Sequence, residues 1–203
     1  MHLLPTHDEI VKVLRETGAL REGHFIFPNG LHSAEYLQLP IAMRYYQHAK
    51  MLSVSLSRLL RANPELRAMI PELSIVSPAT GGLPVAYGVC EALQARQVYW
   101  AEDAPEGGMR LRQYVQPKKG ELVVLVDDIL RAGTRMAQLK SLMEGFGAEV
   151  VAMATVIYNP TPKRHDFGRL PFYYLARLEA SYYADAISCD LCNKSQPAEK
   201  VWI

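Results

Sequence analysis

From residue 73 onwards, short apolar runs alternate with longer segments in which apolar residues recur at helical spacing. The short runs have the length and branched side chains of buried strands. We predict strands at residues 73–77, 97–101, 121–126 and 149–158, and helices at residues 83–94 and 134–147. Strands that alternate with helices form βαβ units. The pattern therefore predicts an α/β fold with a central, mostly parallel sheet flanked by helices.

The first part of the chain predicts two helices on either side of a hood. Thr6 and Glu9 have the spacing of a capping box ahead of an apolar helical stripe, which Gly18 ends. Residues 23–39, GHFIFPNGLHSAEYLQL, carry turn residues at positions 28–30 and predict a hairpin-like N-terminal hood. A second helix is expected at about residues 47–62, where Asn and Pro follow it.

Two further segments depart from the regular alternation. Residues 102–114 are polar and contain Gly107 and Gly108, so we predict an irregular loop that is long enough to act as a mobile lid. Residues 172–183, FYYLARLEASYY, predict one or two late strands with aromatic faces in the core or at a subunit interface. We expect a single domain over residues 1–203, with helix and hood at 1–45, core at 46–160, and C-terminal strands and tail at 161–203.

Charge and composition exclude several classes of partner. The 203 residues include 22 basic and 21 acidic ones, which gives a formal net charge of +1. Such a balance gives no general attraction to nucleic acid or to an acidic membrane, so an anionic ligand must be bound locally. No apolar run reaches membrane-spanning length, and the first residues do not resemble a secretion signal. We expect a cytoplasmic protein.

Three cysteines are too few for a disulfide framework. Cys189 and Cys192, in the sequence CDLC, have the spacing of half a zinc site. No second cysteine pair is visible, and His165 lies far along the chain, so we expect no metal there; a site completed across a dimer is the alternative. His24 and His32 are expected to pack within the hood, with a catalytic role as the alternative.

The candidate chemistry is concentrated in residues 123–134, VVLVDDILRAGT. The apolar run predicts a strand covered on both faces, and ligands of open α/β sheets bind at the carboxyl ends of such strands. Asp127 and Asp128 follow it directly. Two neighbouring carboxylates repel each other and lose hydration at such a position, so a metal or ligand hydroxyl groups must compensate them. A cap for the next helix is the alternative interpretation.

Two loops at predicted strand ends complete a candidate site. Residues 77–82, SPATGG, are small enough for the backbone to approach a ligand, and a following helix start attracts anions. Alone, this loop is equally compatible with a tight strand-to-helix turn. Residues 131–135, RAGTR, open another helix with backbone N–H groups, a hydroxyl group and two cationic side chains. The two loops and the acids predict two anion pockets and a place for a divalent cation.

These motifs resemble the type I phosphoribosyltransferases, and within them the orotate phosphoribosyltransferases. VVLVDDILRAGT is similar to their signature of a strand, two acids, two apolar residues and a phosphate-binding loop. Residues 23–39 resemble their hood, residues 77–89 their pyrophosphate loop and residues 99–114 their flexible catalytic loop. The tail CDLC is similar to a Cys-x-x-Cys of some members. The resemblance covers residues 23–192 in order.

The resemblance implies a substrate, a cofactor and a role for each loop. Members bind phosphoribosyl pyrophosphate (PRPP) with Mg2+ and transfer the phosphoribosyl group to a nucleobase, orotate being the expected base, with pyrophosphate as product. Asp127 and Asp128 would hold the ribose hydroxyls, and Mg2+ through the ligand, and would face the positive charge that develops at the anomeric carbon. Ala79, Thr80 and Gly81 would contact the pyrophosphate. Arg112 would close over it, from a neighbouring subunit of a homodimer if the family pattern holds.

The predicted phosphate loop departs from the family pattern. Ala132, Gly133 and Thr134 would cradle the 5-phosphate, but Arg131, Ala132 and Arg135 stand where family members carry hydroxyl residues, and Thr134 replaces a glycine. Fewer hydroxyl donors weaken a phosphate pocket, whereas arginines offer stronger and bulkier donors. We include Arg131 and Arg135 among the PRPP-binding residues.

The base site departs from the pattern as well. Tyr158 and Asn159 stand where orotate enzymes commonly carry Asp-Arg, so the arginine that would pair with the orotate carboxylate is absent there. We therefore predict a base site with Asn159 and Arg164, in which orotate binds weakly and depends on Arg164 more than on Lys163. The alternative function is a phosphoribosyltransferase-like protein with another base, or a PRPP-binding regulatory protein without orotate activity.

Overall fold

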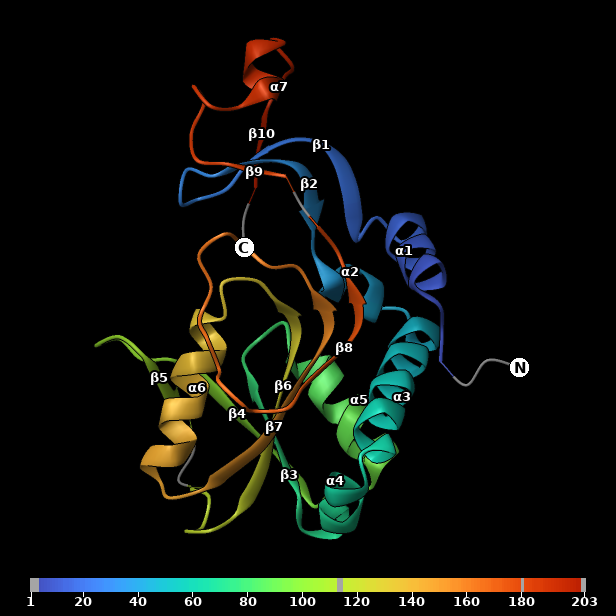
Figure 1. Ribbon diagram of the computed structural model, residues 1–203, viewed down its shortest axis with the longest axis vertical. Coiled ribbons are helices and arrows are strands. Elements are labelled where there is room, and N and C mark those ends of the chain that lie inside the picture. Colours follow the sequence, from blue (N-terminus) through green and yellow to red (C-terminus); the bar gives the residue numbers. More distant parts are fainter. Residues whose placement is uncertain (1–3, 113–114, 180, 202–203) are drawn as a thin grey trace.

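The computed structural model describes residues 4–112, 115–179 and 181–201. A large sheet with helices on both faces forms the core, and a smaller sheet stands above one end of it (Figure 1). Within the described ranges, no helix is both long enough and apolar enough to cross a membrane.

The large sheet has six strands in the order β5-β4-β3-β6-β7-β8. Its strands are β3 (Ser74–Pro78), β4 (Gln97–Asp103), β5 (Met109–Leu111), β6 (Leu122–Leu130), β7 (Glu149–Tyr158) and β8 (Phe172–Arg177). All neighbouring strands pair in parallel except β4 and β5, which are antiparallel. The residues of β3 are all buried, as expected for a strand covered on both faces. The prediction of a mostly parallel sheet is confirmed.

Helices divide between the two faces of this sheet. On one face lie α3 (Tyr46–Ala62) and α5 (Leu83–Leu93) (Figure 1). The short helix α4 (Pro64–Met69) and the 3-10 helix η1 (Ile70–Glu72) follow α3 in the chain. On the other face lies α6 (Thr134–Gly145) (Figure 1). Leu52 and Leu56 of α3 are fully buried in the first layer of core. Leu139 and Met143 of α6 are fully buried in the second. Each amphipathic helix thus covers one side of the sheet with its apolar stripe.

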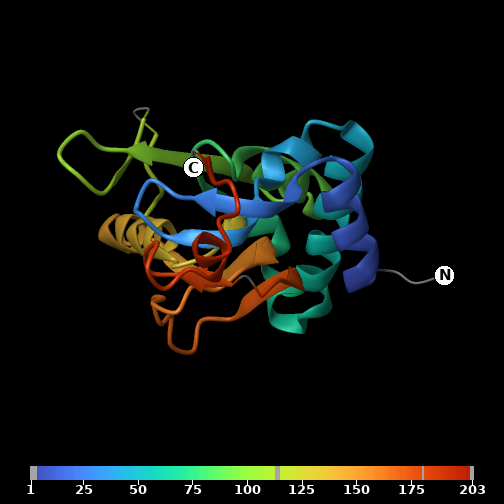
Figure 2. The same cartoon turned by 90° about the horizontal axis from the view of Figure 1, so that it is seen from above.

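The smaller sheet is built from both ends of the chain, and we call it the hood sheet. It has the order β10-β1-β2-β9, and β1 and β2 form the predicted antiparallel hairpin. Its strands are β1 (Leu20–Ile26), β2 (His32–Leu37), β9 (Tyr182–Tyr183) and β10 (Glu199–Lys200). The helices next to these strands in the chain are α1 (His7–Glu16), α2 (Leu39–Met43) and α7 (Asp190–Asn193). Seen from above, the first and last parts of the chain lie together over the core (Figure 2).

The strand order creates a crevice at one edge of the core sheet. β3 lies between β4 and β6, and the chain leaves β3 through α5 on one face but leaves β6 through α6 on the other. The loops after β3 and β6 therefore diverge at adjacent strand ends. Open α/β sheets bind their ligands at such a switch point.

Residues 102–114 were predicted to form an irregular loop, and over the described residues 102–112 this prediction is wrong, because they form a hairpin. β4 continues to Asp103, and β5 returns against it with Glu102 opposite Arg110 and Asp103 opposite Met109. The turn is closed by the N–H of Gly107, which donates to the carbonyl of Ala104 at 2.9 Å. Met109 is 8% exposed and packs into the core, which anchors the returning strand. Residues 113 and 114 of the predicted lid lie outside the described residues.

Candidate active site

The two neighbouring acids lie inside a strand. β6 was expected to end at residue 126, but it continues to Leu130, and Asp127 pairs with Thr155 of β7. Asp127 is 8% exposed. Its Oδ1 accepts a hydrogen bond from the Asp128 N–H at 2.8 Å, and Asp128 Oδ1 accepts one from the Ile129 N–H at the same distance. The carboxylates are thereby fixed by their own backbone at the switch point.

Burial raises the pKa of both acids. Loss of hydration raises the pKa of Asp127 well above the ordinary carboxyl value, and the neighbouring charge of Asp128 raises it further. Loss of hydration also raises the pKa of Asp128, against the lowering effects of hydrogen bonds from Asp127 and Ile129 and of the Arg131 charge. A cation or a set of ligand hydroxyl groups at this position would relieve the cost of the paired charges.

The loop after β3 lies directly against the acids. A Cβ atom on Gly81 would stand 2.9 Å from Asp128 Oδ2, and one on Gly82 would stand 2.7 Å from Asp127 Oδ1 and in contact with Ser77 Oγ. Only glycine fits at these two positions without a shift of the carboxylates. Ala79 and Thr80 continue the same loop, so the structure brings the predicted pyrophosphate loop and both acids together.

The loop after β6 opens helix α6. Gly133 is the N-cap residue with φ of 79°, and a Cβ atom there would stand 3.0 Å from the Phe167 ring. Ala132 precedes it, and Thr134 is the first residue of the helix. The first N–H groups of an α-helix have no partner within the helix and favour an anion. The 12-residue α6 therefore presents an anion-binding end beside the acids.

Arg135 connects the two loops. Its guanidinium donates to the carbonyl of Ala79 in the first loop and, at 3.2 Å, to Asp103 Oδ2 at the end of β4. One side chain of α6 therefore contacts both the loop after β3 and the base of the β4-β5 hairpin. Sequence reasoning missed Asp103, which carried no motif.

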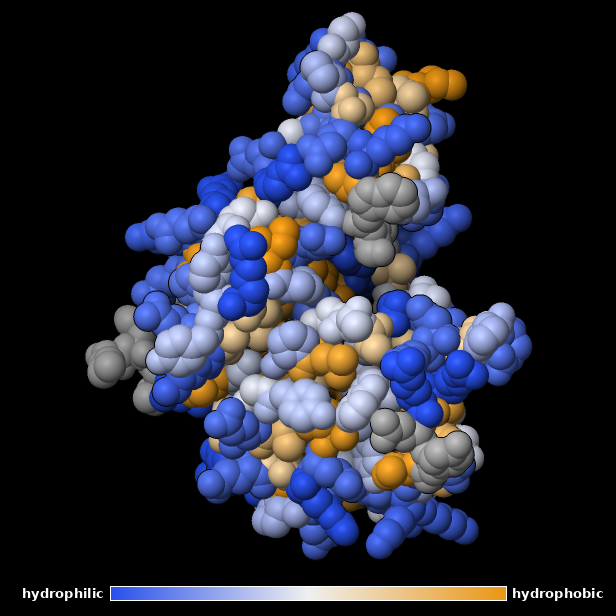
Figure 3. All heavy atoms as spheres, turned by 180° about the vertical axis from the view of Figure 1, so that it is seen from behind, coloured by the Kyte–Doolittle hydropathy of each residue, from blue (hydrophilic) through white to orange (hydrophobic). Residues whose placement is uncertain are grey.

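Two adjoining cavities occupy the space between these loops and the hood sheet. The larger, about 380 Å³, is lined by both acids, the 79–81 loop and hood residues Tyr36, Leu37 and Gln38. The smaller, about 250 Å³, is lined by residues 129–136 and by Phe27, Asn29, Leu31 and Tyr182 of the hood. From behind, a hollow is visible between the hood and the core (Figure 3). The hood thus forms a wall of the site. Sequence reasoning placed the hood but did not identify these wall residues, whose only signal was the family resemblance.

Arg131 lies where the two cavities meet. It lines both, and one of its terminal nitrogens donates to the Leu37 carbonyl at 2.6 Å. Its Nε atom is buried and has no hydrogen-bond partner. An unsatisfied buried guanidinium N–H is costly unless a ligand accepts from it. Arg131 thus contacts the hood wall at Leu37.

Three predicted site residues line neither of these two cavities. Arg112 forms an ion pair with Glu102 at 3.0 Å and lines a separate cavity of about 100 Å³ with Tyr99 and Trp100. Arg164 is exposed and lines none of the cavities described here. Asn159 is 3% exposed. Its amide donates to the Leu178 carbonyl and accepts from the Tyr182 hydroxyl, so both ends of the amide are engaged within the protein.

Comparisons with known proteins agree with this geometry. The sequence profile of the phosphoribosyl transferase domain matches residues 46–168. The chain belongs to the phosphoribosyltransferase family. It is 32% identical over 191 residues to the orotate phosphoribosyltransferase of Thermotoga maritima, covering 94% of this chain and 96% of that one. It is 33% identical over 192 residues to the orotate phosphoribosyltransferase of Carboxydothermus hydrogenoformans, covering 95% of each.

Solved structures share the fold of this phosphoribosyltransferase. The crystal structure of orotate phosphoribosyltransferase from Aeropyrum pernix superimposes with a TM-score of 0.66 at 20% sequence identity, over 83% of this chain and 93% of that one. The resemblance inferred from the motifs, and the α/β fold inferred from the hydrophobic pattern, are both confirmed.

Proposed function

We propose that this phosphoribosyltransferase transfers the phosphoribosyl group of PRPP to orotate and releases pyrophosphate. One observation carries the proposal: Asp127 and Asp128 line one cavity with the 79–81 loop, and Asp127 lines the adjoining cavity with the start of α6. This arrangement has two places for phosphate groups on either side of a place for a ribose. The choice of orotate is supported by the relatives above, which are named for that activity.

In this proposal the base nitrogen gives up its proton to solvent and bonds to the anomeric carbon as the bond from that carbon to the pyrophosphate oxygen breaks, and the pyrophosphate leaves with the electron pair. Positive charge develops on the ribose ring. Carboxylates of Asp127 and Asp128, held before the reaction by backbone N–H groups, stabilise that charge without reorganisation. The backbone N–H groups of residues 132–134 bind the 5-phosphate, and the 79–81 loop orients the leaving pyrophosphate.

Magnesium fits the same site. The two carboxylates form a pair of hard oxygen donors whose repulsion a divalent cation would relieve. Asp127 and Asp128 would hold Mg2+ through the ligand, and the ion would supply charge neutralisation of the pyrophosphate.

Arg131 is the proposed partner of the orotate carboxylate. Family members use an arginine at the position of Asn159, whose amide is engaged here with Leu178 and Tyr182. Arg131 instead offers a buried N–H without a partner at the boundary between the acid pair and the hood wall. A guanidinium binds a carboxylate with two parallel hydrogen bonds, so this position would restore the missing contact.

The remaining predictions stay open to test. They are the roles of Arg112 on the pyrophosphate, of Arg164 and Asn159 at the base and of Arg135 at the phosphate, the single domain, the homodimer and the cytoplasmic location. Arg135 is engaged with Ala79 and Asp103, which supports a role in holding the pyrophosphate loop as well.

The test is an assay of the full chain with PRPP, Mg2+ and orotate, followed by orotate absorbance and by pyrophosphate release. Turnover with orotate, absent in the Asp127→Asn/Asp128→Asn double variant, is expected. A panel of other pyrimidine and purine bases serves as the specificity control. No pyrophosphate release with any base would overturn the transferase proposal.

A second function has its own support. Arg131, Ala132 and Arg135 replace hydroxyl residues of the family loop, which alters the donors around the 5-phosphate. An enzyme for another base would release pyrophosphate with that base and not with orotate. A PRPP-binding regulatory protein would bind PRPP with Mg2+ in a calorimetric titration and show no turnover with any base.

A further inference from the structure

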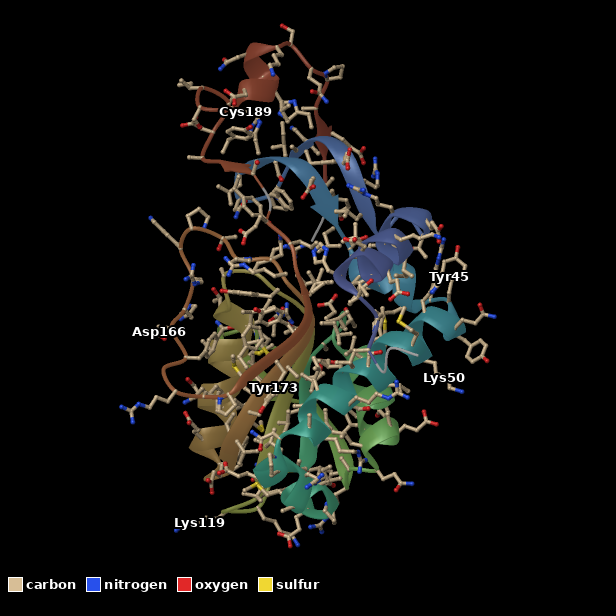
Figure 4. All side chains as sticks on the ribbon, turned by 45° about the vertical axis from the view of Figure 1, so that its right-hand side comes forward. Tyr45, Lys50, Lys119, Asp166, Tyr173 and Cys189 are labelled. Carbon is tan, nitrogen blue, oxygen red and sulfur yellow. The ribbon has the colours of Figure 1, made fainter. Side chains whose placement is uncertain are left out.

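Four potential metal ligands converge at the outer side of the hood sheet. Two of them precede the acid pair in the sequence and two follow it. His24 lies on β1, His32 begins β2, Cys189 is the N-cap residue of α7, and Cys192 lies within α7. One ligand atom from each of these side chains lies within 4.8 Å of all the others. Cys189 lies at the top of the molecule, where α7 sits above the hood strands (Figure 4). We call these residues the hood-tail cluster.

The spacing of the cluster matches a tetrahedral metal site. Bond lengths to zinc of about 2.3 Å for sulfur and about 2.0 Å for nitrogen imply edges of about 3.3–3.8 Å between the ligand atoms. The sulfur atoms of Cys189 and Cys192 both lie 3.6 Å from His24 Nε2, and Cys192 Sγ lies 3.4 Å from His32 Nδ1. The His24 Nε2 to His32 Nδ1 distance is 2.9 Å, slightly shorter than such an edge.

The contacts around His24 also fit a bound cation better than a set of hydrogen bonds. His24 Nδ1 lies 2.8 Å from the Gln196 carbonyl oxygen, which only accepts, so Nδ1 carries a hydrogen and Nε2 is the ring nitrogen whose lone pair is available to a metal. Three atoms face that lone pair, namely His32 Nδ1 and both sulfurs. Only one donor fits a lone pair, whereas one cation between the four groups bonds to all of them. A carbonyl on the other ring nitrogen is the usual support of a metal-bound histidine.

Three of the four ligand side chains are shielded from solvent. Cys189 is fully buried, and His24 and His32 are 3% and 6% exposed. Cys192 is half-buried, and neither cysteine forms a disulfide. The missing half of a zinc site, which the sequence left open or assigned to a partner subunit, is thus supplied by the hood of the same chain.

We propose that His24, His32, Cys189 and Cys192 bind a structural Zn2+ ion. Two thiolates and two imidazoles in tetrahedral arrangement select zinc, and four protein ligands leave no open position for catalysis. The ion fastens α7 to the β1-β2 hairpin. Because β9 supplies Tyr182 to the cavity wall and pairs with β2, zinc stabilises the wall of the active site without touching a substrate.

The test is the metal content of the full chain purified without a metal-affinity step. About one equivalent of zinc per chain is expected for the wild type and for Cys90→Ser, which removes the third, half-buried cysteine on α5 outside the cluster. Cys192→Ser and His32→Ala should retain less than about a tenth of an equivalent, since loss of one ligand opens the site. Chelation of the wild type should lower its melting temperature, and added zinc should restore it.

A second measurement keeps the proposal decidable if a variant does not fold. The chelated wild type is titrated with Co2+, whose visible spectrum distinguishes tetrahedral thiolate ligation from hydrated metal. Saturation at about one equivalent with thiolate-to-cobalt bands is the expected result. A wild type that carries no zinc and gives no such spectrum would overturn the proposal. So would a Cys189–Cys192 disulfide in the freshly purified protein, detected by mass spectrometry before and after reduction.

Discussion

At the scale of single residues, the acid pair opposes stability in the free protein. A carboxyl group whose pKa is raised by folding stabilises the fold fully below its unfolded pKa of about 3.9, and this contribution is lost as the pH rises through the folded pKa. Burial raises the pKa of both Asp127 and Asp128. The site therefore carries a stability cost at neutral pH that ligand binding relieves.

Asp127→Asn should remove this cost. The amide imitates the protonated acid and keeps the oxygen that accepts the Asp128 N–H. We expect an unchanged or higher free energy of unfolding at pH 7, with a difference from wild type that shrinks towards pH 4, and a loss of transferase activity. Urea unfolding across this pH range measures the free energy of unfolding of both proteins. A variant destabilised equally at every pH would contradict the assignment of the cost to charge.

A substitution at Gly82 tests the contact between the loop after β3 and the acids. In Gly82→Ala the new methyl group meets Ser77 Oγ and lies 2.7 Å from Asp127 Oδ1. We expect a loss of about 1–3 kcal/mol of stability, as in other overpacked sites, together with loss of activity. Gly145→Ala is the matched control, since a Cβ atom there meets nothing within 4 Å and the residue lies in α6. That variant should be unchanged or slightly more stable.

Arg131 and Arg164 are alternative partners for the orotate carboxylate. A charge-assisted contact is worth roughly 1.5–3 kcal/mol, so Arg131→Ala should weaken orotate binding by about ten- to a hundredfold. Arg164→Ala should leave it nearly unchanged, because the Arg164 side chain is exposed and lines neither cavity of the site. Calorimetric titration of orotate in the presence of pyrophosphate and Mg2+ measures both. The reverse order of effects would restore Arg164 as the base partner.

At the scale of elements, the sequence predicted what is encoded locally. The capping box of Thr6 and Glu9 is present, whereas the strand predicted to end at residue 126, just before the acids, continues through them to Leu130. The hairpin at 97–111 was missed because its return strand has only three residues, of which Met109 and Leu111 alternate with one polar residue. So short an alternation depends on pairing with β4. The hood-tail cluster was missed because His24 and Cys189 meet only through the fold.

The β4-β5 hairpin is expected to respond to ligand as a unit. Its strands are paired and anchored by Met109, whereas its tip contains Gly107 and Gly108 with φ of 96° and 77° and open space around both. If the hairpin closes over the site, PRPP with Mg2+ should slow hydrogen exchange at residues 102–112. Exchange in α3, on the opposite side of the sheet from α6, is the internal control. An unchanged exchange rate at 102–112 would remove the closing role.

At the scale of the whole molecule, the family resemblance predicts that Arg112 acts on another subunit, and this prediction is untested. In the described chain it pairs with Glu102 and lines a cavity separate from the acid site. If Arg112 serves a partner in a homodimer, Arg112→Ala and the Asp127→Asn/Asp128→Asn variant should each be inactive alone. Mixed and allowed to exchange subunits, they should recover activity in roughly a quarter of the sites, because each hybrid holds one intact site.

The measurement is turnover after co-refolding of equal amounts of the two variants, with each variant refolded alone as control. Recovery in the mixture requires both a dimer and a shared site. Inactivity of the mixture, with hybrids demonstrated by mass, would place Arg112 in its own subunit or outside catalysis.

The strand order of the hood sheet also determines when this sheet can form in a newly made chain. His24 on β1 contacts the carbonyl of Gln196, 172 residues further along, and β10 pairs with β1 only after that point. On the ribosome, the β1-β2 hairpin emerges early with both edges unpaired, and the parallel core has every strand before β9 and β10 cover those edges. Contacts at such long sequence separation form late. The loops after β3 and β6 are therefore formed before the hood sheet that walls both cavities is complete.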